Sequence, residues 1–182
     1  MSTALKKKTN LVLLEESARL QYPLCGEVID GELFVMGRPT AAHMNVEGEV
    51  FADLRRGSGG PPPAGWVFLQ EVEVLFSSTH EKAVPDISGW RAQRISGHLK
   101  ENPITVAPDW VCEVLSDSTR RKDLGPKRDL YARQGILHLW IVDPDAHVLE
   151  AFALSSGKWL LLGTWSEDAI AAGIAPFAEH SF

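Results

Sequence analysis

The stretch Trp110-Val111-Cys112-Glu113-Val114-Leu115 places an acidic residue in the middle of an apolar strand. Upstream, the stretch Val84-Pro85-Asp86-Ile87 places a second acid at the start of another strand. An ionised carboxylate that is buried without a partner costs several kcal/mol, so chains rarely place one in a strand for packing alone. Glu113 should therefore meet a cation or a strong hydrogen-bond donor, and the two acids are the first candidates for a functional site.

Strand geometry makes a shared metal site the simplest use of these two acids. Successive side chains on a strand point to opposite faces, so Glu113 and Leu115 share one face and Val114 has the other. If Asp86 and Glu113 lie at the same level on adjacent strands, both carboxylates can bind one Mg²⁺ or Mn²⁺ ion, because these ions take oxygen ligands. The backbone carbonyl of Val114 is the expected third ligand from the protein.

A helix after the second strand supplies further candidates. Asp123, Lys127 and Tyr131 follow one another at intervals of four residues and so lie along one helix face. Because only a short loop separates this helix from Glu113, Lys127 is expected to reach back towards the metal, where its ammonium group can orient a water or stabilise charge on a phosphate. The simpler alternatives are an exposed Asp123–Lys127 pair and a packing role for Tyr131.

Composition favours one soluble domain over residues 1–182, with residues 1–10 flexible. No apolar run reaches the roughly 18 residues that span a bilayer, and no signal-peptide core is present, so we expect a cytoplasmic protein without a membrane partner. The net charge of −6 argues against a dedicated nucleic-acid coat protein. It does not exclude a nuclease, because a bound divalent ion inverts the local field around carboxylates.

Two clusters of basic residues leave open whether the chain has a phosphate-binding track. The clusters are Arg91, Arg94, His98 and Lys100, and then Arg120, Arg121, Lys122, Lys127 and Arg128. A solvated surface explains both clusters equally well.

The order of elements predicts an α+β fold with a bent mixed sheet flanked by helices. Helices are expected over 11–20, 40–56 and 123–134, the last ending at Gly135. Strands are expected over 27–36, as a hairpin around Asp30-Gly31, and then over 66–76, 85–90, 110–115, 137–142, 147–154 and 158–165. From Glu167 onward we expect a short helix and an extended end.

These residues, taken in order, resemble the Uma-two family of restriction-endonuclease-like proteins, within the PD-(D/E)XK nuclease superfamily. The resemblance covers about Leu11 to Trp165 and depends on the order and spacing of several short motifs. They are Glu27-Val28-Ile29-Asp30-Gly31-Glu32-Leu33, His43, Pro85-Asp86, Glu113-Val114-Leu115-Ser116 with Ser118-Thr119, then Asp123, Lys127 and Tyr131, and Trp140-Ile141-Val142-Asp143-Pro144.

The resemblance implies a protein with a restriction-endonuclease-like fold that cleaves phosphodiester bonds with the help of a metal ion. Asp86 and Glu113 would bind Mg²⁺ or Mn²⁺, and DNA would be the substrate. The superfamily pattern places a lysine two residues after the glutamate, where this chain has Leu115, so Lys127 on the helix is the expected replacement. Glu27, Glu32 and Asp123 are candidates for additional acidic groups at the site, and Glu27 matches the family's N-terminal acid more closely than Glu32.

Two other interpretations remain open at the level of sequence. The chain can be a catalytically silent binding or assembly module that keeps the nuclease fold, with Asp86 and Glu113 held by Lys127 or an arginine in a structural ion network. It can also hydrolyse a non-nucleic substrate with a metal ion, since a fold does not fix a function. A homodimer is plausible by analogy, because two sites suit the cutting of two strands.

Overall fold

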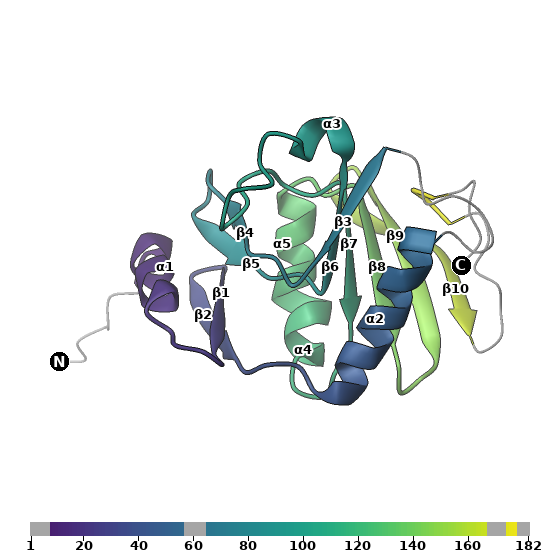
Figure 1. The fold of residues 1–182 in the computed structure, drawn as a ribbon, viewed down its shortest axis with the longest axis horizontal. Coiled ribbons are helices and arrows are strands. Elements are labelled where there is room, and N and C mark those ends of the chain that lie inside the picture. Colours follow the sequence, from purple (N-terminus) through teal and green to yellow (C-terminus); the bar gives the residue numbers. More distant parts are fainter. Residues whose placement is uncertain (1–7, 57–64, 167–173, 178–182) are drawn as a thin grey trace.

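The computed structural model describes residues 8–56, 65–166 and 174–177. Their strands form two sheets, and helices pack against these sheets (Figure 1). This content confirms the predicted α+β class. The elements are α1 (Asn10–Ala18), β1 (Cys25–Ile29), β2 (Glu32–Met36), α2 (Ala41–Arg56), β3 (Trp66–Gln70), β4 (Val74–Phe76), β5 (Glu81–Ala83), β6 (Ile87–Arg91), α3 (Ala92–Ile95), β7 (Trp110–Val114), α4 (Arg120–Lys122), the π-helical turn η1 (Asp123–Lys127), α5 (Arg128–Arg133), β8 (His138–Asp143), β9 (Val148–Ser155) and β10 (Lys158–Ser166).

The larger sheet has six strands in the order β10-β9-β8-β7-β6-β3. Only β7 and β8 pair in parallel, and the helical segment α4-η1-α5 makes the crossover that such a pair requires. Alternation along β7 separates two cores: Trp110 and Cys112 pack with residues of α2, whereas Val111 packs with Leu130 and Tyr131 of α5. Glu113, two residues after Val111, points to the same face of the sheet as Val111, towards α5.

The smaller sheet has four strands in the order β2-β1-β5-β4, and α5 lies between the two sheets (Figure 1). Its β1–β2 hairpin turns at Asp30 and Gly31, whose φ angles are 53° and 75°, as the Asp-Gly signal predicted. The sequence predicted one bent mixed sheet, and hydrogen bonding divides the strands between two sheets. Hydrophobic side chains from both sheets meet in one core around α5.

Three local predictions were wrong. The strand expected over 66–76 is interrupted at Glu71, which has a φ of 46°, so β3 and β4 join different sheets. The three-residue strand β5 was not predicted, because its residues, Glu81–Ala83, carry two charges that mask the strand pattern. The helix expected from Asp123 begins at Arg120 and kinks at Gly125, next to Pro126, which cannot donate a backbone hydrogen bond.

The ends of the chain are only partly described. Of the segment 1–10 that was expected to be flexible, residues 1–7 lie outside the described residues, and Thr9 caps α1. The predicted helix after Glu167 also lies outside them, except for 174–177, where Ile174 and Phe177 pack into the core beside α2. No helix in the described ranges is long and apolar enough to cross a membrane.

Candidate active site

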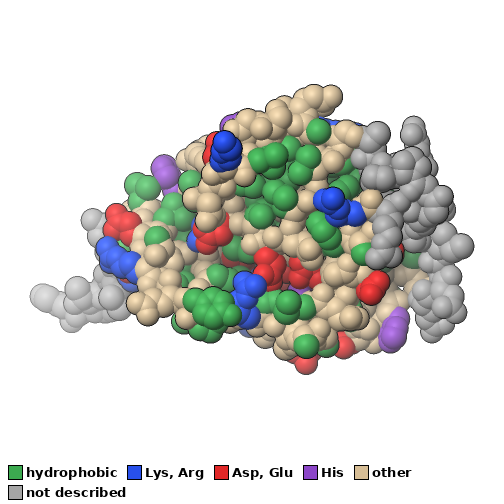
Figure 2. Space-filling view, in the orientation of Figure 1, with side chains coloured by type: hydrophobic (Ala, Val, Ile, Leu, Met, Phe, Trp, Pro, Cys, Tyr) green, Lys and Arg blue, Asp and Glu red, His purple; other side chains and the backbone are tan. Residues whose placement is uncertain are grey.

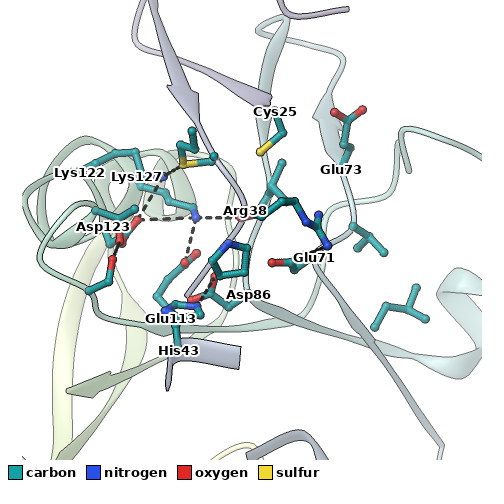
Figure 3. Close-up of a pocket in the computed structure, with 18 of the residues that line it drawn as sticks. Cys25, Arg38, His43, Glu71, Glu73, Asp86, Glu113, Lys122, Asp123 and Lys127 are labelled. Atoms are coloured by element: carbon teal, nitrogen blue, oxygen red, sulfur yellow. Dashed lines mark hydrogen bonds and ion pairs between the residues drawn. The ribbon is translucent and has the colours of Figure 1, made fainter. Parts of the chain in front are cut away.

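Asp86 and Glu113 come together where β6 begins and β7 ends. The antiparallel register pairs Ile87 with Cys112. Asp86 precedes Ile87 and Glu113 follows Cys112, so the two acids are opposite each other. Both line an open pocket of about 810 Å³ (Figure 3). The structure therefore brings together the two acids that the sequence singled out.

The Glu113 carboxylate is almost completely buried, with 1% of the residue exposed, and both of its oxygens have donors. The Tyr131 hydroxyl donates to Oε1, and the Lys127 ammonium donates to Oε2 at 2.8 Å. Burial raises the pKa of Glu113 well above its usual range, and the negative charge of Asp86 adds to this rise, while Lys127 opposes it. Tyr131 therefore both packs in the core and orients the carboxylate.

Lys127 is the cation at the centre of the site (Figure 3). Its Nζ lies 2.8 Å from Glu113, 3.0 Å from Oε1 of Glu27 and 3.7 Å from Asp123, and it donates to the Val84 carbonyl at 3.0 Å. Burial alone would lower the pKa of Lys127, but the carboxylates of Glu113 and Glu27 outweigh it and hold the pKa well above its usual range. The neighbouring carboxylates therefore favour the charged form of Lys127.

The additional acidic candidates separate into two groups. Glu27 on β1 is fully buried, and it pairs with Lys127 and with Lys122, whose Nζ donates to Oε2. Burial alone would raise the pKa of Glu27, yet the two ammonium groups hold it below its usual value. Asp123 is also buried and lines the pocket. Glu32, by contrast, is exposed at the start of β2 and does not line the pocket.

Asp86 is held from two sides. The backbone N–H of Val114 donates to Oδ2 at 2.6 Å, so Val114 contacts this acid through its N–H group. On the other side, Nε2 of His43 lies 3.4 Å from Oδ1. The hydrogen bond to Asp86 is the main cause that raises the pKa of His43 above its usual value. Helix α2 thus contributes to the site through His43.

Glu47, one turn after His43 on α2, was not identified from the sequence. It is 3% exposed and accepts a hydrogen bond from the Gln70 side chain at 3.0 Å. Burial, with a contribution from the Asp86 charge, raises the pKa of Glu47 to about 7. The i, i+4 spacing of His43 and Glu47 was the available signal, since it puts both on one helix face. Lys122 was seen only as part of a basic cluster.

The carboxylates suit a hard divalent ion. Among the described residues, Glu27, Glu113 and Asp123 share the ammonium groups of Lys122 and Lys127, whereas Asp86 lies against His43. Oδ1 of Asp123 is buried without a hydrogen-bond donor, although both lysines lie within 3.7 Å. Within the described ranges, no group of three or more His, Cys, Asp or Glu residues is arranged to hold a metal ion. An ion such as Mg²⁺ is typically held by one or two carboxylates and waters, and Asp86 and Glu113 can supply two carboxylates.

The fold and the site define the class: an α+β protein of restriction-endonuclease-like architecture with a pocket of buried acids and lysines. The chain belongs to the Uma2 family, described as "Putative restriction endonuclease", whose model matches residues 14–175. A solved structure from Anabaena variabilis, titled a "putative nuclease belonging to DUF820", shares the fold: its TM-score is 0.65, the identity is 23%, and the match covers 86% of each chain. No curated protein matches the chain. Family and fold together support a nuclease-like function.

Proposed function

We propose that the protein is a single-domain, metal-dependent DNA endonuclease that hydrolyses phosphodiester bonds with Mg²⁺ or Mn²⁺. The observation that carries this proposal is the convergence of Asp86, Glu113 and Lys127, from three different elements, on one pocket. Two carboxylates beside an ammonium group provide both an oxygen ligand set for a hard cation and a positive charge for a phosphate.

Each side chain has a distinct role in this proposal. Asp86, Glu113 and the carbonyl of Val114 would hold the ion, which supplies Lewis acidity and lowers the pKa of water when bound. Lys127 lies beside Glu113 and opposes the rise in the pKa of Glu113 that burial causes. The same ammonium group can stabilise negative charge that develops on the phosphate. Tyr131 fixes the Glu113 carboxylate, and Asp123 is a further acid beside Lys127.

Cleavage of supercoiled plasmid tests this proposal. The parent protein is expected to nick or linearise the plasmid with Mg²⁺ or Mn²⁺ and to lose this activity in EDTA. Glu113→Ala, purified identically, should be inactive, and Glu32→Gln, which changes an exposed acid away from the pocket, should keep parental activity. Equal activity in the parent and in Glu113→Ala would reject the proposal, because the activity would then come from a contaminant.

A catalytically silent binding or assembly module is the second candidate. The observation that favours it is that both oxygens of Glu113 already accept hydrogen bonds from Lys127 and Tyr131, so this carboxylate has partners without a metal. Titration with Mn²⁺, followed by electron paramagnetic resonance, separates the two candidates. Stoichiometric binding that is lost in Asp86→Asn supports the enzyme, and absence of binding supports the silent module.

We also propose a homodimer and a cytoplasmic location. The outer strand β10 presents Leu160, Leu161 and Leu162 with 42–56% of each residue exposed, and two copies of such an edge can pair antiparallel around a twofold axis. The free thiols of Cys25 and Cys112 are consistent with a reducing compartment.

A further inference from the structure

The acids of the site lie at the bottom of the pocket. Glu113 is 1% exposed and Lys127 is 2% exposed, and the surrounding walls come from residues 35–40, 69–73, 99–104 and 116–119. A volume of about 810 Å³ lies within the range of roughly 300–1,000 Å³ typical of sites that enclose small ligands. One or two nucleotides can enter such a space.

The walls above the acids are largely apolar. Val35 and Leu99 line the pocket with 49% and 53% of their surface exposed, and Leu69, Val72 and Ile104 line it as well. Figure 2 shows acidic side chains in the hollow of this face with hydrophobic side chains around them. Exposed aliphatic side chains gain from contact with the flat faces of nucleobases. Those faces are covered in a duplex, where neighbouring bases stack, and free in an unpaired strand.

The positive charges of the pocket are already paired with carboxylates. Among the described residues that line it, the lysine and arginine side chains are Arg38, Lys122 and Lys127, and both lysines are buried in ion pairs. Arg38, at the rim, lies 3.1 Å from Glu71. Neutralisation of phosphates contributes to the binding of duplex and single strand alike, so a pocket whose cations are paired must gain affinity from contacts between bases and its apolar walls.

Part of the basic clusters seen in the sequence is paired with carboxylates, whereas Lys100 and Arg121 are exposed. Arg94 pairs with Asp109, and Arg120 binds Asp143 through both of its terminal nitrogens. Three wall residues, Glu71, Glu73 and Glu101, are themselves acidic. Glu71 is itself paired with Arg38 and Glu73 with Lys82, so the apolar side chains are the part of the wall that suits an unpaired strand, whose bases are free to turn towards them.

We propose that the pocket takes an unpaired DNA strand and discriminates against an intact duplex. This inference rests on the proposed nuclease function and specifies its substrate class. The strand enters with bases against Val35 and Leu99 and with one phosphate directed to Asp86, Glu113 and Lys127. A supercoiled plasmid is cut because negative supercoiling exposes unpaired segments, and the same sequence as a relaxed linear duplex resists.

Binding and cleavage are tested separately on one sequence. A fluorescein-labelled 20-nucleotide strand and its duplex are titrated with the parent protein in Ca²⁺, and fluorescence anisotropy reports the dissociation constants. We expect the single strand to bind at least tenfold tighter. Leu99→Glu should weaken single-strand binding at least fivefold, whereas Leu137→Glu, at an equally exposed leucine away from the pocket, should leave it unchanged.

Each outcome has a defined meaning. Equal or tighter binding of the duplex, absence of binding to both forms, or no effect of Leu99→Glu overturns the inference about the strand. Cleavage in Mg²⁺ that is equally fast on both forms also overturns it, while the nuclease proposal stands. Preferential binding of the single strand with no cleavage of either form supports the inference about the pocket and rejects hydrolysis as the function.

Discussion

At the scale of single residues, the buried acids of the site are compensated by a small number of cations, and Lys127 pairs with several of them. Lys127 contacts Glu113, Glu27 and Asp123, and its ammonium group is nearly inaccessible to water. Breaking a buried ion pair by removing one partner is costly, because an uncompensated charge remains in a low-dielectric environment. Lys127 therefore contributes to the stability of the fold as well as to the proposed chemistry.

Lys127→Met is expected to destabilise the protein by about 3–5 kcal/mol, since it leaves Glu113 and Glu27 with less compensation. Urea unfolding followed by tryptophan fluorescence measures this change. Lys158→Met, at an exposed lysine on β10, is the matched control and should change stability by less than about 0.5 kcal/mol. A loss below about 1 kcal/mol for Lys127→Met would contradict the buried-network description.

Glu47 predicts a pH dependence whose sign follows from its raised pKa. The folded-state value is about 7, and the unfolded value is roughly 4.3. Between these values the folded protein binds more protons, so stability falls as pH rises through this window, and the full cost is present above about pH 7. Glu47→Gln cannot ionise and removes this cost. It should be more stable than the parent by about 1–3 kcal/mol at pH 8 and equally stable at pH 4.

Chemical denaturation at the two pH values tests this expectation for Glu47. Glu49→Gln, which changes an exposed acid on the same helix, should give the same stability difference from the parent at both pH values. If Glu47→Gln also gave the same stability difference at both pH values, burial would not raise the pKa of Glu47.

At the scale of elements, the connection between β7 and β8 fixes where the helix residues of the site can lie. The parallel pairing requires a crossover, and α4-η1-α5 carries Asp123, Lys127 and Tyr131 across the sheet to the Glu113 side. Gly135 ends this crossover with a φ of 73°, and a Cβ built there meets no atom within 4 Å. Any cost of an alanine at this position therefore comes from the backbone conformation.

Gly135→Ala should lower stability by about 1–2 kcal/mol, because an L-residue is disfavoured in the left-handed region. Gly48→Ala, inside α2 and with equal room for a Cβ, should raise stability by about 0.5–1 kcal/mol, since alanine is the better helix former. Thermal unfolding by circular dichroism compares the two variants. Melting temperatures that shift in the same direction would contradict the left-handed conformation of Gly135 or the helical conformation of Gly48.

At the scale of the whole molecule, the exposed edge of the larger sheet determines the expected assembly. β10 is the last strand of that sheet, and its three consecutive leucines are all exposed. An apolar edge strand of this kind is a template for pairing with another chain. Since a second copy carries the same edge, pairing around a twofold axis closes the assembly at two chains.

The protein is therefore expected to be a dimer at micromolar concentration by light scattering coupled to size exclusion. The double variant Leu160→Glu with Leu162→Glu should be a monomer, and Leu24→Glu, at an exposed leucine between α1 and β1, should stay dimeric. A parent that is monomeric throughout this concentration range would reject the dimer.

Much of the site could be predicted from local sequence. Alternation in Trp110–Leu115 separates Glu113 from its apolar neighbours, and the spacing of Lys127 and Tyr131 places both on one helix face. The Asp30-Gly31 signal set the hairpin correctly. These features are local, because strand parity, helix periodicity and turn conformation depend on residues within a few positions of one another.

Only the tertiary structure decided which distant residues complete the site. Glu27 is brought to Lys127 from 100 positions away and is buried, whereas Glu32, five residues later, remains exposed. Glu47 gains its raised pKa from burial and from Asp86, which belongs to another element. The sequence by itself determined the acids, the lysine and their local faces. Burial, charge compensation and the shape of the pocket depend on several elements that come together only in the folded chain, so no local sequence pattern predicts them.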